Sequence, residues 1–352
     1  MTTLDDIRER LTEIRAPGIP RDIVAAGMVR GVGFDSGIVT IQLQPAAMPA
    51  PSLQATLAEI RRAVGALPGV QRVDVQNAGA SPLGDLGPLP SVRDILAVSS
   101  TKGGVGKSTV AANLALALAS LGRRVGLLDA DVYGPSLPMM FGLNGRPQVS
   151  DQKRIAPLEK YGVRLMSIGF FLDESSPVIW RGPLVMGLVR QFLKDVDWGE
   201  LDVLIVDMPP GTGDAQLTLV QQVPLAGAVV VTTPQEVATL DVQRGIAMFA
   251  KVNTPVLGVI ENMSYYHCPR CGRDDEVFGH GGGERIARAF GLPLLGRLPL
   301  LLEVRQAGDS GAPLVQAHPE HPVSREFVRI GTQVLAAVEA ERARDAAPTI
   351  IG

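Results

Sequence analysis

The chain has 352 residues, of which 46% are apolar and 20% charged, so it has the composition of a folded protein of two domains. Its net charge of −3 and aromatic content of 4% argue against nonspecific binding to nucleic acid or to acidic lipid. The start of the chain carries no basic segment followed by an apolar run, and no apolar stretch is long enough for a membrane span. We therefore expect a cytoplasmic protein that binds neither nucleic acid nor membrane.

The first 76 residues predict a small α/β domain, because two stretches with helical spacing alternate with three strand-like runs. In chain order we expect a helix at 4–15, strands at 29–34 and 38–43, a helix at 52–67 and a strand at 71–75. Residues 77–92 are rich in Gly and Pro and nearly uncharged, which predicts a linker.

From residue 93 the pattern changes to short apolar strands separated by helices. Such strands are typical of a parallel sheet that is covered on both faces. Residues 93–345 therefore predict an α/β fold with a doubly wound, mostly parallel sheet, and residues 346–352 a short tail. The expected strands are 95–99, 125–128, 203–206, 228–232 and 256–260, with helices at 107–121 and 324–344.

A glycine-rich loop at residues 102–109, Lys-Gly-Gly-Val-Gly-Lys-Ser-Thr, follows the first of these strands and precedes a helix. This context is the one that a phosphate-binding loop requires, because glycines let backbone N–H groups face phosphate oxygens at a helix N-terminus. We expect Lys107 to contact the β- and γ-phosphates of ATP and Ser108 to hold Mg²⁺. The predicted ATP-binding residues are Gly103, Gly104, Val105, Gly106, Lys107, Ser108, Thr109 and Asn262.

Acidic residues follow two other predicted strands, at the sheet edge where ligands bind in such folds. Asp207 is predicted to hold Mg²⁺ through water. Asp131 is the candidate for orienting the water that attacks the γ-phosphate, with Asp129 in support. Asn262 closes a further strand; alone it indicates a turn, although an amide can both donate to and accept from adenine.

The only cysteines, Cys268 and Cys271, lie together in the sequence Cys-Pro-Arg-Cys. Two thiolates at this spacing can hold one metal centre, but they cannot complete the ligand set of a cubane cluster or a structural zinc. Either His267 or His280 adds a ligand, or a second subunit supplies two more thiolates. The spacing does not choose between zinc and iron–sulfur, and a redox dithiol or an incidental pair stays open.

Lys102 is an additional cation at the start of the glycine-rich loop. With it, the loop resembles the deviant Walker A loop of the MinD, ParA and nitrogenase iron-protein class. The resemblance implies that Lys102 reaches across a dimer to the partner's nucleotide and acts in trans, as an arginine finger does. It also implies that Asn262 reads the adenine base.

Several motifs in combination resemble the Mrp/ApbC iron–sulfur cluster carrier family, over roughly residues 93–345. The resemblance implies a homodimer that bridges a labile 4Fe–4S cluster through the paired Cys268 and Cys271. It also implies slow ATP hydrolysis and transfer of the cluster to apo-proteins. The motifs lie at residues 102–109, 129–136, 180–183, 207–214 and 268–271.

Residues 4–76 resemble the small α/β domain that is fused to bacterial carriers and shared with SufT-type assembly factors. Related domains commonly carry a Cys-Pro pair after the second strand, where this chain has Ala-Ala-Met-Pro at residues 46–49. The missing thiol argues against a direct role in holding a cluster, and docking becomes the expected role.

Three other functions compete with the carrier. A MinD- or ParA-like switch would dimerise with ATP without a cluster, but the C-x-x-C motif and the lack of a basic amphipathic tail oppose it. A reductase like the nitrogenase iron protein would also bridge a cluster, but its cysteines are widely separated. An ATPase dimer held by zinc is the third.

Overall fold

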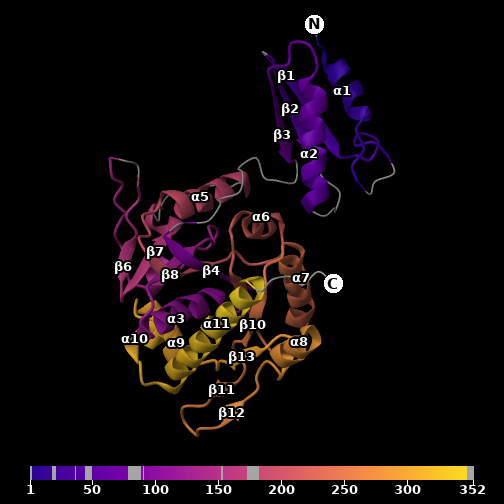
Figure 1. Cartoon of the computed structure of the whole chain (residues 1–352). Helices are drawn as coiled ribbons and strands as arrows, with labels where there is room; N and C mark the ends of the chain where they lie inside the picture. Colours follow the sequence, from indigo (N-terminus) through magenta and orange to yellow (C-terminus); the bar gives the residue numbers. More distant parts are fainter. Residues whose placement is uncertain are drawn as a thin grey trace. The chain divides into compact units, whose positions relative to one another are not determined.

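A computed structural model describes residues 2–17, 21–35, 37–43, 50–77, 89, 91–151, 154–172 and 182–346. The chain forms two compact units, Met1–Asp85 and Leu86–Gly352, whose helices and strands are labelled in Figure 1. Four stretches for which the sequence makes a prediction lie wholly or partly outside the described residues. These are the stretch 46–49, most of the predicted linker, the first two residues of the motif at 180–183, and the tail from residue 347.

In its described residues, the N-terminal unit contains two helices and a three-stranded sheet, as predicted. Its elements are α1 (Leu4–Thr12), β1 (Val29–Asp35), β2 (Ile38–Leu43), α2 (Ala50–Gly65) and β3 (Arg72–Asn77). β2 pairs antiparallel with β1 and parallel with β3. Alternate residues of β2, Val39 and Ile41, are buried against Ile7 of α1 and Ile60 of α2, which follows from the two-residue period of a strand.

The C-terminal unit is built on an eight-stranded sheet in the order β13-β10-β9-β4-β8-β5-β7-β6. Its strands are β4 (Val92–Ser99), β5 (Val125–Asp129), β6 (Leu158–Lys160), β7 (Val163–Ser167), β8 (Leu201–Asp207), β9 (Gly227–Thr232), β10 (Val256–Glu261) and β13 (Leu294–Arg297). Every neighbouring pair is parallel except β6 and β7, so the predicted doubly wound, mostly parallel sheet is confirmed. The five strands expected from the sequence are all present, whereas β6, β7 and β13 were not expected.

Helices cover both faces of this sheet (Figure 1). They are α3 (Lys107–Ser120), α4 (Leu137–Met140), α5 (Gly182–Asp195), α6 (Asp214–Gln222), α7 (Glu236–Lys251), α8 (Gly282–Phe290), α9 (Leu302–Asp309), α10 (Leu314–Ala317) and α11 (Pro322–Ala346). On β4, Leu96 and Val98 join the core that contains α3 and α11, while Ile95 and Ala97 join the core that contains α5 and α7. Among the described residues, no helix is both long and apolar enough to cross a bilayer.

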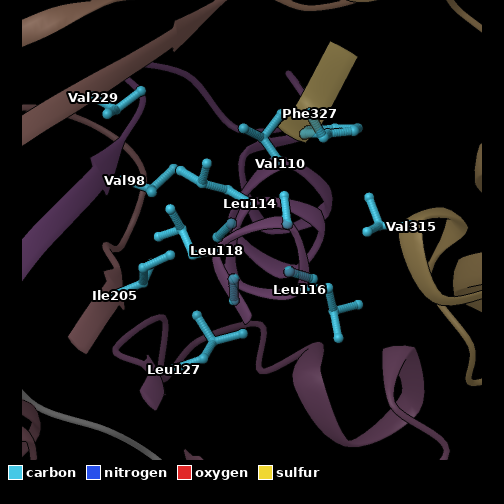
Figure 2. Packing of buried hydrophobic residues seen from close by; sticks show 14 of the residues in the cluster. Val98, Val110, Leu114, Leu116, Leu118, Leu127, Ile205, Val229, Val315 and Phe327 are labelled. Atoms are coloured by element: carbon cyan, nitrogen blue, oxygen red, sulfur yellow. The ribbon is translucent and has the colours of Figure 1, made fainter. Parts of the chain in front are cut away.

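Helix α3 is buried on nearly every side, which explains its apolar sequence. Figure 2 shows its residues Val110 and Leu114 enclosed by side chains of β4, β8 and α11. The one buried amide, Asn113, is satisfied: its Oδ1 accepts from Val315 N at 3.0 Å, and its Nδ2 donates to Thr109 O at 2.9 Å. This packing holds the glycine-rich loop, which precedes α3, against the sheet.

Arg342→Met is expected to lower the free energy of unfolding by about 3 kcal/mol, because it leaves the buried carboxylate of Asp94 without its main partner. Asp94 on β4 is 2% exposed, and its carboxylate contacts Arg342 of α11 and Arg93, the latter at 3.4 Å. Urea denaturation measures the change. Arg325→Met, which removes an exposed pair with Glu320, is the control and is expected to cost below about 1 kcal/mol. Equal losses in the two variants would contradict the prediction.

Candidate functional site

The glycine-rich loop lies between β4 and α3, at the position that the sequence predicted. Gly104 and Gly106 have φ values of 78° and 81°, in the left-handed region that glycine adopts at little cost. The loop lines a cavity of about 340 Å³. The loop follows the carboxyl end of β4, which lies between β8 and β9 in the middle of the sheet. In such folds ligands bind at the carboxyl ends of the strands, where the strand order changes direction.

Lys107 lines this cavity and is buried, with 6% of its side chain exposed. Its Nζ contacts Asp207 Oδ1 directly and lies 3.2 Å from Ser108 Oγ and 3.9 Å from Asp131 Oδ2. The two carboxylates balance the charge of the buried ammonium group. The structure thus brings Lys107 together with Ser108 and Asp207, which the sequence assigned to Mg²⁺, and with Asp131, the candidate for orienting the attacking water.

Asp207 ends β8 and is fully buried. Its Oδ2 has no hydrogen-bond partner among the described residues, although such buried oxygens are normally paired. A carboxylate oxygen and the neighbouring Ser108 hydroxyl are ligands that suit Mg²⁺. The residues present therefore fit the ion that the sequence predicted for this position.

Asp129 organises the loop that follows β5. Its carboxylate accepts from the backbone N–H groups of Asp131 and Ser136 at 3.1 Å, and from the hydroxyl of Ser167 at 3.1 Å. Burial, and next the charge of Asp207, raise the pKa of Asp129 to about 7. With these partners its oxygens are occupied, which suits the supporting role predicted for it.

Asp131 lines the cavity and is better placed than Asp129 to meet a ligand. Burial raises the pKa of its carboxyl, and Lys107 opposes the shift. The role of orienting the attacking water stays a prediction.

Lys102 also lines the cavity, and its Nζ lies 3.4 Å from Asp241 Oδ2 of α7 in the same chain. Arg244 shares that carboxylate at 3.3 Å. A role in trans requires Lys102 to leave Asp241, and that role stays a prediction.

Asn262 follows β10 and is 9% exposed. Its Nδ2 donates to the carbonyl oxygen of Val105 at 2.8 Å, so the side chain fastens the glycine-rich loop to the end of β10. A Cβ atom at Gly106 would lie 2.3 Å from the same Nδ2, so a larger residue there would displace the Asn262 side chain from Val105. Recognition of adenine by Asn262 stays a prediction.

Other cavity residues carry no local signal in the sequence, because they come from α4 and α9. They meet the glycine-rich loop only through the fold: Met139, Met140, Val304, Arg305, Gly308 and Asp309. Pro210 also lines the cavity and belongs to the motif at 207–214.

The cysteines occupy the turn of a small hairpin formed by β11 (Tyr266–His267) and β12 (Asp274–Asp275). Cys268 N donates to Arg273 O at 2.9 Å, and Gly272 N donates to Cys268 O at 2.8 Å. Cys268 is half-buried and Cys271 exposed, and both thiols are free. The backbone N–H groups of Arg270 and then Cys271 lower the pKa of the Cys268 thiol.

The two histidines considered as further ligands each contact a carboxylate. His267 Nδ1 lies 2.7 Å from Asp274 Oδ1, and His280 Nδ1 lies 3.3 Å from Glu276 Oε2. Within the described part of the chain, no three His, Cys, Asp or Glu side chains gather into a metal site. A centre that needs four protein ligands would therefore need ligands besides the cysteine pair.

Comparison with known proteins identifies the family. The profile of the ParA family described as "NUBPL iron-transfer P-loop NTPase" matches residues 91–335. The chain belongs to this family. A second profile, for an iron–sulfur cluster assembly protein domain, matches residues 4–75.

Relatives and solved structures agree with this assignment. An iron–sulfur cluster carrier protein of Synechocystis is 45% identical over 95% of this chain and 97% of its own length. A nucleotide-binding protein of Archaeoglobus fulgidus, solved with ADP, is 40% identical over 68% of this chain and 93% of its own, with a TM-score of 0.59. The cell division ATPase MinD of Pyrococcus furiosus shares the fold at 21% identity and a TM-score of 0.52, covering 69% of this chain and 98% of its own.

The chain is therefore a P-loop NTPase of an iron–sulfur carrier family. Its phosphate-binding loop, residues 102–109, lines the cavity. The resemblance proposed from the sequence is thereby confirmed.

Proposed function

We propose that this iron-transfer P-loop NTPase works as a homodimer that holds one 4Fe–4S cluster between Cys268 and Cys271 of each subunit and passes it to apo-proteins. One observation carries the proposal. Two free thiols stand on a hairpin turn without a third ligand in the described chain, so a second copy completes the set of four. The exposure of Cys271 suits transfer, because an incoming thiol must reach the cluster.

We further propose that the cavity binds ATP and hydrolyses it slowly. The backbone N–H groups of residues 103–109 and the ammonium group of Lys107 bind the phosphates. Ser108 and Asp207 would hold Mg²⁺, which supplies positive charge beside the phosphates when bound. Asp131 orients the attacking water, Asp129 holds the loop that carries Asp131, and Lys102 of the partner subunit stabilises the developing charge.

The N-terminal unit contains no cysteine, so we propose that it docks cluster-assembly proteins or recipients rather than holding the cluster. We place its boundary at residue 76, the linker at 77–92 and the ATPase domain at 93–345. We also propose that the protein acts in the cytoplasm, without binding nucleic acid or membrane.

An anaerobic iron and sulfide assay with an absorption spectrum tests the cluster. After reconstitution, the wild type is expected to hold about four irons and four sulfides per dimer, since the proposed cluster is 4Fe–4S. The Cys268→Ser/Cys271→Ser variant is expected to hold almost none while binding ATP as the wild type does. A full iron complement in this variant would refute the bridging arrangement. Zinc in place of iron would favour a dimer held by zinc, and no metal would favour a nucleotide-driven switch.

A further inference from the structure

The segment that leaves β10 joins the nucleotide cavity to the cysteine hairpin. Asn262, its first residue, is bonded to Val105 of the glycine-rich loop. Met263 lies beside the same loop, since a Cβ atom added to Gly106 would be 3.7 Å from Met263 Cε. The segment then runs through β11 directly into Cys268. The backbone that contacts the phosphate loop is therefore continuous with the backbone that carries the thiols.

Met263 adopts an unusual backbone conformation at the start of this segment. Its φ is 53°, in the left-handed region that a methionine rarely occupies. Hydrogen bonds on both sides enforce this conformation: Asn262 N donates to Thr232 O at 2.8 Å, and Ser264 N donates to Leu298 O at 2.9 Å. Backbone strain persists only where the surroundings impose it, so losing a contact here would redirect the residues that follow.

A charge pair between the buried carboxylate of Glu261 and the partly exposed Arg297 connects this segment to the far side of the hairpin. Glu261 is fully buried, and its carboxylate accepts from Gly283 N at 2.6 Å and from the hydroxyl of Ser264. Arg297 Nε lies 3.3 Å from Glu261 Oε1 and donates to Ser264 Oγ at 2.8 Å. Its Nη2 lies 3.7 Å from Oε1 of Glu276, the residue directly after β12. Arg297 therefore contacts the chain both before and after the hairpin.

We propose that Glu261 and Arg297 are positioning residues that couple occupancy of the nucleotide cavity to the accessibility of Cys268 and Cys271. This inference rests on the proposed function, in which Cys268 and Cys271 of the hairpin hold the cluster. A nucleotide that draws Asn262 away from Val105 removes a contact that holds the strained segment. The Glu261–Arg297 pair then moves with Ser264 and carries the change to the other end of the hairpin.

The rate of thiol labelling by an aromatic disulfide reagent tests the coupling, because the hairpin carries the only two cysteines of the chain. The full-length, reduced, metal-free protein is labelled with and without Mg-ADP, at two protein concentrations so that association is recognised. In the wild type, Mg-ADP is expected to change the rate by about five-fold or more, independently of protein concentration. In Arg297→Gln the change is expected to fall below about two-fold, while affinity for ADP stays within about two-fold of the wild type.

Further variants separate coupling from general loosening. Arg297→Lys keeps a cation near Glu261 and is expected to restore part of the response. Glu261→Gln keeps the acceptor for Gly283 N, loses the charge and is expected to lose the response. Arg329→Gln is the matched control: Arg329 Nη2 donates to Leu295 O of β13 at 2.6 Å but contacts no hairpin residue in the hydrogen bonds and ion pairs found for the described chain.

Two outcomes would overturn the inference: a wild-type labelling rate that does not respond to Mg-ADP, or a full response in Arg297→Gln. Neither depends on iron. A chain that failed the iron and sulfide assay but showed the labelling response would lose the cluster proposal and keep the coupling.

Discussion

Lys107→Met is expected to lower the affinity for ATP by about 100-fold or more, because it removes a buried, desolvated partner of the phosphates. Lys107 is a buried cation that lines the cavity, where it contacts Asp207 and lies near Asp131. Without it, the bound phosphates would face these carboxylates uncompensated. Isothermal titration with Mg-ATP measures the loss.

Misfolding has to be separated from loss of binding in this variant. Removing Lys107 leaves the buried carboxylate of Asp207 unpaired, which is expected to cost about 3 kcal/mol of stability. The double variant Lys107→Met/Asp207→Asn removes that charge and is expected to recover stability without recovering affinity. Lys251→Met, at the exposed end of α7, is the control and should bind ATP as the wild type does. ATP affinity near the wild-type value in Lys107→Met would contradict the assignment of the phosphate loop.

Lys102→Ala is expected to reduce the turnover of ATP by about 1,000-fold while leaving nucleotide affinity within a few-fold, as for a charge supplied in trans. The side chain is 34% exposed and its partner Asp241 is 28% exposed, so removing Lys102 leaves no buried charge behind. Steady-state release of phosphate at saturating ATP, together with an ATP titration, separates turnover from binding. Wild-type turnover in this variant would rule out the role in trans.

Asp241→Asn distinguishes the catalytic role of Lys102 from a structural one. In the structure Asp241 holds Lys102 within its own chain, at 3.4 Å. If Lys102 acts on the partner's nucleotide, releasing it should leave turnover unchanged or raise it. If the pair serves only to fasten the glycine-rich loop to α7, Asp241→Asn and Lys102→Ala should reduce turnover equally.

The glycine-rich loop, the five main strands and the cysteine pair were predictable because each is encoded within a short stretch of sequence. A phosphate loop depends on where glycines and one lysine stand between a strand and a helix. Buried strands reveal themselves by continuous apolar runs, as at 203–206, where every residue is buried. By contrast β6 is short, and none of its three residues is fully buried, so it gave no comparable signal.

The run of glycines at 281–283 is required by tertiary contacts that a local sequence pattern does not reveal. In the sequence it marks only the end of the cysteine loop. In the structure Gly282 and Gly283 let α8 begin against the rest of the unit: added Cβ atoms would lie 2.4 Å from Pro234 O and 2.9 Å from Glu261 Cβ. The need for glycine comes from a close approach between segments, which no local spacing encodes.

The amino-acid sequence by itself determined the kind of site, since the loop at 102–109 and the pair Cys268 and Cys271 are contiguous motifs with their own chemistry. The tertiary structure decided which side chains complete and connect them. Asp207 reaches Lys107 from 100 positions away, and Asn262 reaches Val105 from 157. Such contacts depend on which strands lie side by side, and that order follows from packing helices on both faces of the sheet rather than from any local pattern.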